Sequence, residues 1–286
     1  MNFTDVLARR GAPGYASEWP FVPGMEVAGA IEGPLGEGVE GLAPGDSVVA
    51  FTPDGGAFAE YVLADAQLAT GVPAGLDPAT ATIIPLTWAT ALGLARRAHV
   101  APGDKVLVTS AAGGVGTALA AVLARHGAGL VVGGIGSPAK AEALAPGYVP
   151  VVRDAGFFAN ATAAAGSGFD VILDSLGGTL LAESASNLAI GGRLVSYGGA
   201  AGQPDPATPG FGDLRATNKT VSGFSILRLA RTAPQHVRTL IHDVMHLARN
   251  GLVVTPPTVV GWDNLIDAHL RQSEGTAVGK TVVALS

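Results

Sequence analysis

The stretch VLVTSAAGGVG, residues 106–116, passes from an apolar run into small residues. Its first three residues are typical of a strand that is buried on both faces, as in a parallel sheet. Residues 111–116 then fit the pattern G-x-G-x-x-G with alanine in the first glycine place. Such a turn lets the backbone approach a pyrophosphate, which the free N–H groups of the following helix stabilise. The candidate binding residues are Gly113, Gly114, Val115 and Gly116, and the alternative is a plain strand–helix turn.

Strands and helices alternate through the middle of the chain. Apolar runs predict strands at residues 105–110, 130–135, 149–152, 169–174 and 193–197. Helical spacing predicts helices between them, at residues 115–125, 138–144, 157–165 and 180–189. This order predicts an α/β fold with a doubly wound parallel sheet. The glycine turn follows the first of these strands, where such a fold binds dinucleotides.

Both ends of the chain differ from the middle. Short β-like segments broken by glycine and proline occur at residues 25–31, 47–51, 58–63, 252–260 and 280–286. We therefore expect a smaller β-rich domain made from residues 1–86 and 227–286. The dinucleotide-binding domain, residues 87–226, is inserted between these two parts. A loop rich in glycine and proline, residues 198–213, follows the last strand of the alternating region.

The composition argues against several classes of function. Only 14% of the 286 residues are charged and the net charge is −6, so nucleic acid is not an expected partner. The chain has no cysteine, which excludes disulfides, thiolate zinc sites and a cysteine nucleophile. The sequence shows neither a signal-peptide pattern nor an apolar run long enough to span a membrane. We therefore expect a cytoplasmic protein with no membrane partner.

Eight segments, in the same order along the chain, resemble the zinc-independent quinone oxidoreductases. They are NFTDVLARRG (2–11), FVPGMEVAGAIE (21–32), GDSVVAF (45–51), GGAFAEYV (55–62), VLVTSAAGGVG (106–116), FDVILDSLGG (169–178), GGRLVSYGG (191–199) and GKTVVALS (279–286). That family belongs to the medium-chain dehydrogenase/reductase superfamily, together with the enoyl reductases of polyketide and fatty-acid synthases. The resemblance implies a Rossmann domain inserted in a GroES-like β domain.

The resemblance also implies an activity. Members of the family transfer hydride from NADPH to the β-carbon of an enone, or reduce quinones. A small apolar substrate and a homodimer follow from the same likeness. The segment TVSGFSIL, residues 220–227, is apolar and β-prone, which suits the edge strand through which relatives pair. The alternative is a tailoring protein, such as a cyclase or a non-redox binding protein, that keeps the fold without simple reduction.

The residues after the second predicted strand bear on the choice of nicotinamide cofactor. An NAD enzyme places an acid about 20 residues past the glycine turn. Here Ser137 stands at that place and Lys140 follows it, and a hydroxyl with an ammonium suits a 2′-phosphate. The resemblance implies the same pair for NADPH, and it implies that Arg153 lies near the same phosphate. The alternative is that both cations are ordinary surface residues.

Four further cofactor contacts rest on the resemblance alone. It implies that Ser175 lies by the ribose and that Gly198 and Gly199 lie beside the nicotinamide. Synthase enoyl reductases carry a lysine in the place of Gly199, so the glycine favours the quinone oxidoreductase branch. Thr90 resembles a threonine near the nicotinamide, and Thr87 is its rival. Either threonine could simply cap a helix.

Two residues are candidates for catalysis. Relatives have a tyrosine shortly after the DVLxRxG motif, but here Pro13 occupies that slot and Tyr15 stands two places later. Tyr15 either donates a proton or only packs. Asn2, which opens the same motif, is the second candidate. Relatives also carry more strands before this motif, so the resemblance implies a truncated β domain, through either a misassigned start codon or a remodelled substrate side.

The sequence HDVMH, residues 242–246, resembles half of a zinc-binding helix. His242 and His246 stand four residues apart and so share a helix face, as two metal ligands would. No third ligand is indicated, and the neighbouring valines and leucines form the apolar face of the helix. We therefore expect both histidines to be exposed to solvent and the protein to use no metal.

Overall fold

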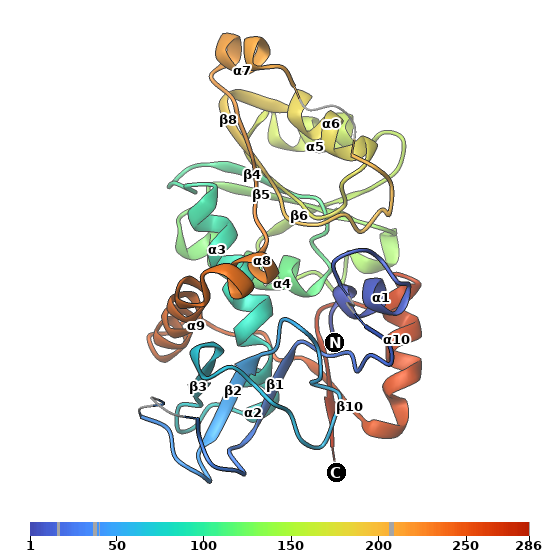
Figure 1. Ribbon diagram of the computed structural model, residues 1–286. Coiled ribbons are helices and arrows are strands. Elements are labelled where there is room, and N and C mark those ends of the chain that lie inside the picture. Colours follow the sequence, from blue (N-terminus) through green and yellow to red (C-terminus); the bar gives the residue numbers. More distant parts are fainter. Residues whose placement is uncertain (16–17, 37–38, 40, 206–208, 286) are drawn as a thin grey trace. The chain divides into compact units, whose positions relative to one another are not determined.

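The computed structural model describes residues 1–15, 18–36, 39, 41–205 and 209–285 (Figure 1). The chain folds into two compact units. Unit 1 consists of Met1–Thr90 and Ile226–Ser286, and unit 2 consists of Ala91–Ser225. The boundaries predicted from the sequence lie after residues 86 and 226.

Unit 2 is built on a six-stranded parallel sheet with the strand order β6-β5-β4-β7-β8-β9. Its strands are β4 (Lys105–Val108), β5 (Leu130–Ile135), β6 (Tyr148–Val152), β7 (Phe169–Asp174), β8 (Leu188–Ser196) and β9 (Thr220–Gly223). The predicted α/β fold with a doubly wound parallel sheet is confirmed. β5 and β6 lie on one side of β4, whereas β7, β8 and β9 lie on its other side. Sheets of this kind bind ligands at this change of side, between β4 and β7.

The helices of unit 2 connect these strands. They are α4 (Gly114–Arg125), α5 (Phe157–Ala165), α6 (Thr179–Ser186), α7 (Phe211–Thr217) and the short 3₁₀ turn η3 (Pro138–Lys140), while α3 (Ala89–Arg97) begins at the end of unit 1. The helix predicted at residues 138–144 is only the η3 turn. A helix there would be one or two turns long and followed by Pro146, which disfavours helical backbone in the residue before it.

The core of unit 2 forms where strand side chains meet a helix. The buried residues of this cluster are Leu107, Val132, Val151, Phe157, Phe158, Ala161, Ala165, Phe169, Ile172, Ala185, Leu188 and Leu194. Leu188 belongs to this core as the first residue of β8, so the helix predicted at residues 180–189 ends earlier, at Ser186. The tertiary contact therefore overrides the local helical spacing.

Unit 1 contains two small sheets. β1 (Glu26–Ala30), β2 (Ser47–Phe51) and β3 (Ala69–Gly71) form an antiparallel sheet, and β10 (Thr258–Gly261) pairs with β11 (Thr281–Ala284) in parallel. The other elements are α1 (Phe3–Arg9), α2 (Pro78–Thr82), α8 (Ile226–Thr232), α9 (Pro234–Arg249), α10 (Leu265–Ser273), the 3₁₀ turns η1 (Ala66–Leu68) and η4 (Trp262–Asn264), and the π-helical turn η2 (Ile84–Trp88).

In unit 1 one strand prediction is wrong and another has the wrong start. Residues 58–63 form no strand, and Tyr61 and Leu63 are 73% and 98% exposed. The alternating side chains there have no buried surface to pack against, and β2 pairs with β3 instead. The strand predicted at residues 252–260 begins only at Thr258. Two prolines precede this residue, and proline has no N–H to donate to a ladder.

Candidate dinucleotide site and a buried ionic network

The glycine turn between β4 and α4 is closely packed. A Cβ on Gly116 would lie 2.3 Å from the carbonyl oxygen of Ser110 and 2.5 Å from that of Ala111, so only glycine lets the first turn of α4 approach the loop. A Cβ on Gly113 would meet its nearest neighbour at 3.5 Å. The N–H groups of the first turn have no partner inside the helix, and they lie at the positive end of its dipole. This end of α4 can therefore hold an anion.

Tyr148, at the start of β6, supports this turn from the neighbouring strand. Its hydroxyl donates a hydrogen bond of 2.6 Å to the carbonyl oxygen of Gly116. Burial raises the pKa of Tyr148 well above its ordinary value, and nearby Tyr197 raises it further, so the phenol stays protonated and remains a donor. Tyr148 is not among the candidates predicted from the sequence. The consecutive glycines of β5, Gly133 and Gly134, are a signal of close approach that could have found it.

Two cations meet at the carboxyl ends of β5 and β6. Lys140 lies in η3, which Ser137 precedes, and Arg153 follows β6. A Cβ on Gly136 would lie 3.2 Å from the Nη2 atom of Arg153, so this side chain reaches the end of β5. Burial lowers the pKa of Lys140, and the charge of Arg153 lowers it further. Ser137, Lys140 and Arg153 therefore share one edge of the sheet.

Arg153 also carries an unsatisfied polar atom. Within the described part of the chain, its Nε is buried and has no hydrogen-bond partner. Burial lowers the pKa of Arg153, although the charge of Asp174 acts in the opposite direction. A buried donor without a partner costs free energy, so this position fits a ligand that accepts a hydrogen bond.

The ends of β7 and β8 add further groups at the same edge of the sheet. Asp174 is fully buried and accepts hydrogen bonds from the hydroxyl of Thr109 at 2.8 Å and the N–H of Gly177 at 2.9 Å. Burial nevertheless raises the pKa of Asp174 above its ordinary value. Tyr197 follows β8, and burial likewise raises the pKa of its phenol, which is hydrogen-bonded to the side chain of Ser175.

Two of the predicted glycines follow Tyr197 and differ in their surroundings. A Cβ on Gly198 would lie 2.7 Å from the carbonyl oxygen of Ser175, so the backbone there requires glycine. A Cβ on Gly199 would meet nothing within 4 Å. Gly199 therefore presents open backbone beside the buried end of the sheet. Together with the glycine turn, unit 2 gathers the cofactor candidates at residues 113–116, 137, 140, 153, 175, 198 and 199.

In unit 1, Asn2 belongs to a buried ionic network. Lys280 forms an ion pair of 2.5 Å with Glu26, and the two side chains are 6% and 1% exposed. The amide of Asn2 joins them, because its Nδ2 donates to Glu26 at 3.1 Å and its Oδ1 accepts from Lys280. Glu26 also accepts hydrogen bonds from the hydroxyl of Thr87 at 3.2 Å and from the N–H groups of η2. These bonds join α1, β1, η2 and the start of β11.

The charge of Glu26 is stabilised by this network. Burial alone would raise the pKa of its carboxyl group. The charge of Lys280 and the hydrogen bonds from Lys280 and Asn2 outweigh that effect, and the pKa of Glu26 lies below its ordinary value. Thr87, the rival of Thr90 in the sequence analysis, thus donates its hydroxyl to a structural carboxylate. Thr90 is buried in the first turn of α3.

Tyr15 lies in a turn after α1, and its N–H donates to the carbonyl oxygen of Ala12 at 3.3 Å. The side chain is half-buried. The neighbouring Gly14 accepts a hydrogen bond of 3.3 Å from Arg231, which is ion-paired with Asp54 at 3.0 Å. Arg231 therefore holds the loop that carries Tyr15. Asn2, Tyr15 and Thr90 all belong to unit 1.

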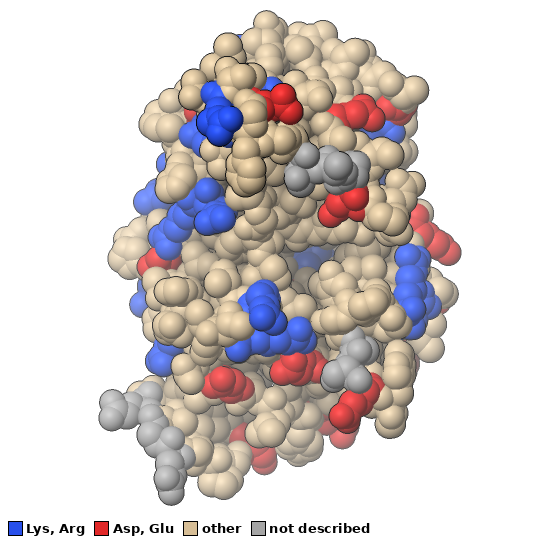
Figure 2. Space-filling model, turned by 45° about the horizontal axis from the view of Figure 1, so that its top comes forward, with Lys and Arg blue, Asp and Glu red and all other residues tan. Residues whose placement is uncertain are grey.

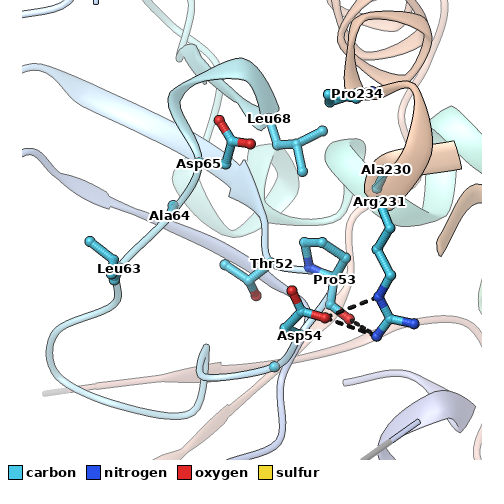
Figure 3. A pocket seen from close by; sticks show the side chains of 11 residues that line it. Thr52, Pro53, Asp54, Leu63, Ala64, Asp65, Leu68, Ala230, Arg231 and Pro234 are labelled. Carbon is cyan, nitrogen blue, oxygen red and sulfur yellow. Dashed lines mark hydrogen bonds and ion pairs between the residues drawn. The ribbon is translucent and has the colours of Figure 1, made fainter. Parts of the chain in front are cut away.

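Unit 1 also has an open pocket beside this ion pair (Figure 3). Its volume is about 340 Å³, and its lining comes from the loops after β2 and before β3 and from α8 and the start of α9. The residues that line it are Thr52, Pro53, Asp54, Gly55, Leu63, Ala64, Asp65, Leu68, Ala230, Arg231 and Pro234. The guanidinium of Arg231 bonds to Asp54 and to the carbonyl oxygen of Pro53, so its charge is engaged by the pocket wall.

His242 and His246 lie on α9 and are exposed. The Nε2 atom of His242 is 3.2 Å from the hydroxyl of Thr70. Among the residues that the structure describes, no three histidine, aspartate or glutamate side chains are grouped so that they could hold a metal ion. In the same residues, no helix is long and apolar enough to cross a membrane. On the face drawn in Figure 2, charged side chains of both signs lie between wide uncharged areas.

Two family models match the chain. Residues 1–74 match the alcohol dehydrogenase GroES-like domain, and residues 147–283 match the zinc-binding dehydrogenase family. Pikromycin polyketide synthase component PikAII of Streptomyces venezuelae is 32% identical over 299 residues, which cover 100% of this chain and 7% of the relative. Quinone oxidoreductase-like protein 2 of Mus musculus is 32% identical over 213 residues, which cover 71% of this chain and 59% of the relative.

Solved structures agree with these matches. Mycobacterial Rv1454c complexed with NADPH is 28% identical, with a TM-score of 0.84 over 99% of this chain and 88% of the other. CurK enoyl reductase is 26% identical, with a TM-score of 0.83 over 100% of this chain and 88% of the other. The parallel sheet of unit 2, the small antiparallel sheet of unit 1 and these likenesses lead to one conclusion: the chain belongs to the medium-chain dehydrogenase/reductase superfamily.

Proposed function

We propose that this chain is an NADPH-dependent, metal-independent reductase that transfers hydride to an activated C=C bond, as in an enone, or to a quinone. The observation that carries the proposal is the group of Ser137, Lys140 and Arg153 at the ends of β5 and β6. An NAD enzyme has an acid there for the ribose hydroxyls, whereas cations suit a 2′-phosphate. The superfamily and the likeness to an NADPH complex support the choice of cofactor.

The residues present fit such a cofactor. The free N–H groups at the start of α4 suit a pyrophosphate. The buried Nε of Arg153, without a partner among the described residues, suits a phosphate oxygen. In this proposal Ser175, Gly198, Gly199 and Thr90 contact the ribose and nicotinamide half.

The bound cofactor would supply the hydride, so the protein's part is to bind, orient and provide a proton. Tyr15 is the proposed proton donor, since it carries a phenol in a loop that Arg231 holds. Asn2 is proposed to contact the substrate through the second hydrogen of its Nδ2, because the first one serves Glu26. The proposal needs no metal, and the chain has no cysteine from which the superfamily's thiolate zinc sites are built.

The proposal also includes a class of substrate and an oligomeric state. Likeness to polyketide synthases and to an enoyl reductase supports an apolar enone of the polyketide type as substrate. We also propose a cytoplasmic homodimer. β9 is the last strand of its sheet, and an edge strand of this kind can pair with a second copy.

Calorimetric titration with NADPH and NADH tests the proposal. We expect tight binding of NADPH and weak binding of NADH. Lys140→Ala should weaken NADPH by about 1–3 kcal/mol, as expected for a charge-assisted hydrogen bond, and leave NADH nearly unchanged. Lys219→Ala, a lysine of the same unit whose Nζ bonds to the carbonyl oxygen of Ala185, is the matched control. Equal affinity for both nucleotides, or no binding of either, would refute the proposal.

A further inference from the structure

The first turn of α4 is fixed from two sides at Gly116. On one side its Cα lies against the carbonyl oxygens of Ser110 and Ala111, where a Cβ would come within 2.5 Å of both. On the other side its own carbonyl oxygen accepts the hydroxyl of Tyr148 at 2.6 Å. Gly116 is thus held against both the loop and β6. In the proposed function its neighbouring N–H groups bind the pyrophosphate.

β5, the strand next to this turn, has space for the ring of Tyr148 at Gly133. A Cβ on Gly133 would lie 2.8 Å from the Cδ1 atom of Tyr148 and 2.7 Å from the Cβ of Ala111. The missing side chain of Gly133 therefore leaves room for both the phenol ring and the methyl group of Ala111 in the glycine turn. The contact is built from three segments: the turn, the middle of β5 and the start of β6.

We infer that Tyr148 is a positioning residue for the pyrophosphate half of the dinucleotide site, and this inference rests on the proposed binding of NADPH. The hydroxyl does not need to touch the ligand. By holding the carbonyl oxygen of Gly116, it fixes the peptide group between Gly116 and Thr117. Through this peptide group it steadies the first turn of α4, which carries the N–H groups of Gly114, Val115 and Gly116. A donor group that is already oriented loses less conformational entropy when the ligand binds, and so binds more tightly.

β6 positions one residue for each half of the proposed site. Tyr148 begins β6, and Arg153 follows its last residue, Val152. Tyr148 supports the turn for the pyrophosphate, whereas Arg153 lies with Lys140 at the proposed place of the 2′-phosphate. Removal of the Tyr148 hydroxyl should therefore affect one half of the ligand and spare the other.

Tyr148→Phe tests this inference with two ligands. NADPH contains both the pyrophosphate and the 2′-phosphate, and adenosine 2′-phosphate contains only the latter. We expect Tyr148→Phe to weaken NADPH by about tenfold, the equivalent of one hydrogen bond, and to leave adenosine 2′-phosphate unchanged. In steady-state reduction the variant should raise the KM for NADPH without lowering kcat. In the free protein, the amide hydrogens of residues 114–118 should exchange faster.

Two further variants complete the test. Gly133→Ala should push the phenol ring aside and give the same division between the two ligands. Thr162→Val removes a hydroxyl that bonds to Asn187 at 3.2 Å in the same unit, and it should change neither ligand. The inference is overturned if NADPH binds the Tyr148→Phe protein as tightly as the unaltered one. Equal weakening of both ligands also overturns it, because Tyr148 would then support the whole unit. Failure of the unaltered protein to bind NADPH overturns the proposed function, and the inference with it.

Discussion

The two units use their charged side chains in opposite ways. In unit 1, Glu26 and Lys280 are almost fully buried and ion-paired with each other, and the amide of Asn2 bonds to both. In unit 2, the cations Lys140 and Arg153 lie close enough for Arg153 to lower the pKa of Lys140. The first arrangement pairs two opposite charges, whereas the second places two cations together, with the charge of Asp174 also acting on Arg153.

This difference separates a structural cluster from a binding site. Opposite charges that satisfy each other in a buried place have little left to offer a ligand, and their loss affects folding. Like charges in one place repel, and an anionic ligand relieves that repulsion. We therefore interpret the ion pair of Glu26 and Lys280 in unit 1 as a structural element, and in the proposed function the cations of unit 2 bind the cofactor.

The largest effect is expected when the network of unit 1 is broken. Lys280→Met leaves Glu26 buried without its ion-pair partner, so we expect the free energy of unfolding of unit 1 to fall by about 3–5 kcal/mol. Urea denaturation followed by the fluorescence of Trp88, which is buried in η2, measures this change.

The double variant Glu26→Gln/Lys280→Met serves as the control. It removes both charges and should recover part of the lost stability, because no uncompensated charge remains buried. If Lys280→Met costs less than about 1 kcal/mol, as a surface ion pair would, the network is not a structural element.

A middle-sized effect is expected on ligand binding rather than folding. Arg153→Met should weaken NADPH by about 1–3 kcal/mol, because a charge-assisted hydrogen bond is lost. Without ligand, the melting temperature should stay constant or rise, because the cost of burying Arg153 outweighs the attraction of Asp174 and the repulsion of Lys140 is removed. Calorimetry and thermal melting measure the two quantities on the same preparation. A large loss of stability in the absence of ligand would show that both units use their charges in the same way.

The smallest effect concerns the pH dependence of unit 1. The pKa of Glu26 in the folded protein lies below its ordinary value of 4.5, so its carboxylate contributes stability that is fully present above that pH. The contribution is lost as the pH falls through the lowered pKa of the folded state. The unfolding free energy of the unaltered protein should therefore fall more steeply below pH 4.5 than that of Glu26→Gln. Parallel curves for the two proteins in that range would contradict the assignment.

Local sequence patterns were sufficient to predict much of the secondary structure of unit 2. The predicted bounds of β5 and β7 agree with the structure, because strands buried on both faces read as continuous apolar runs. The alternation of strands and helices then predicts parallel strands, whose carboxyl ends lie at the same edge of the sheet. For this reason the sequence alone predicts that the glycine turn, Ser137 and Lys140 lie at one edge of the sheet.

Local sequence patterns failed for two segments. The alternating residues 58–63 suggest a strand, but β2 pairs with residues 69–71 instead. Glycine and proline in residues 198–213 suggest a loop throughout, yet α7 begins at Phe211. The first case depends on the pairing of β2 with a different segment, whereas α7 has no buried side chain and its helix is a local feature that the glycine and proline content of the loop did not indicate.

The sequence by itself determined the α/β class, the glycine turn and the absence of an acid after β5, because each depends on neighbouring residues alone. Only the tertiary structure decided that Tyr148 supports Gly116 and that Lys280 bonds to Asn2 and Glu26. Asn2 and Lys280 are 278 residues apart. No periodicity or spacing reports such a contact, because it exists only once the hydrophobic core has brought both ends of the chain together.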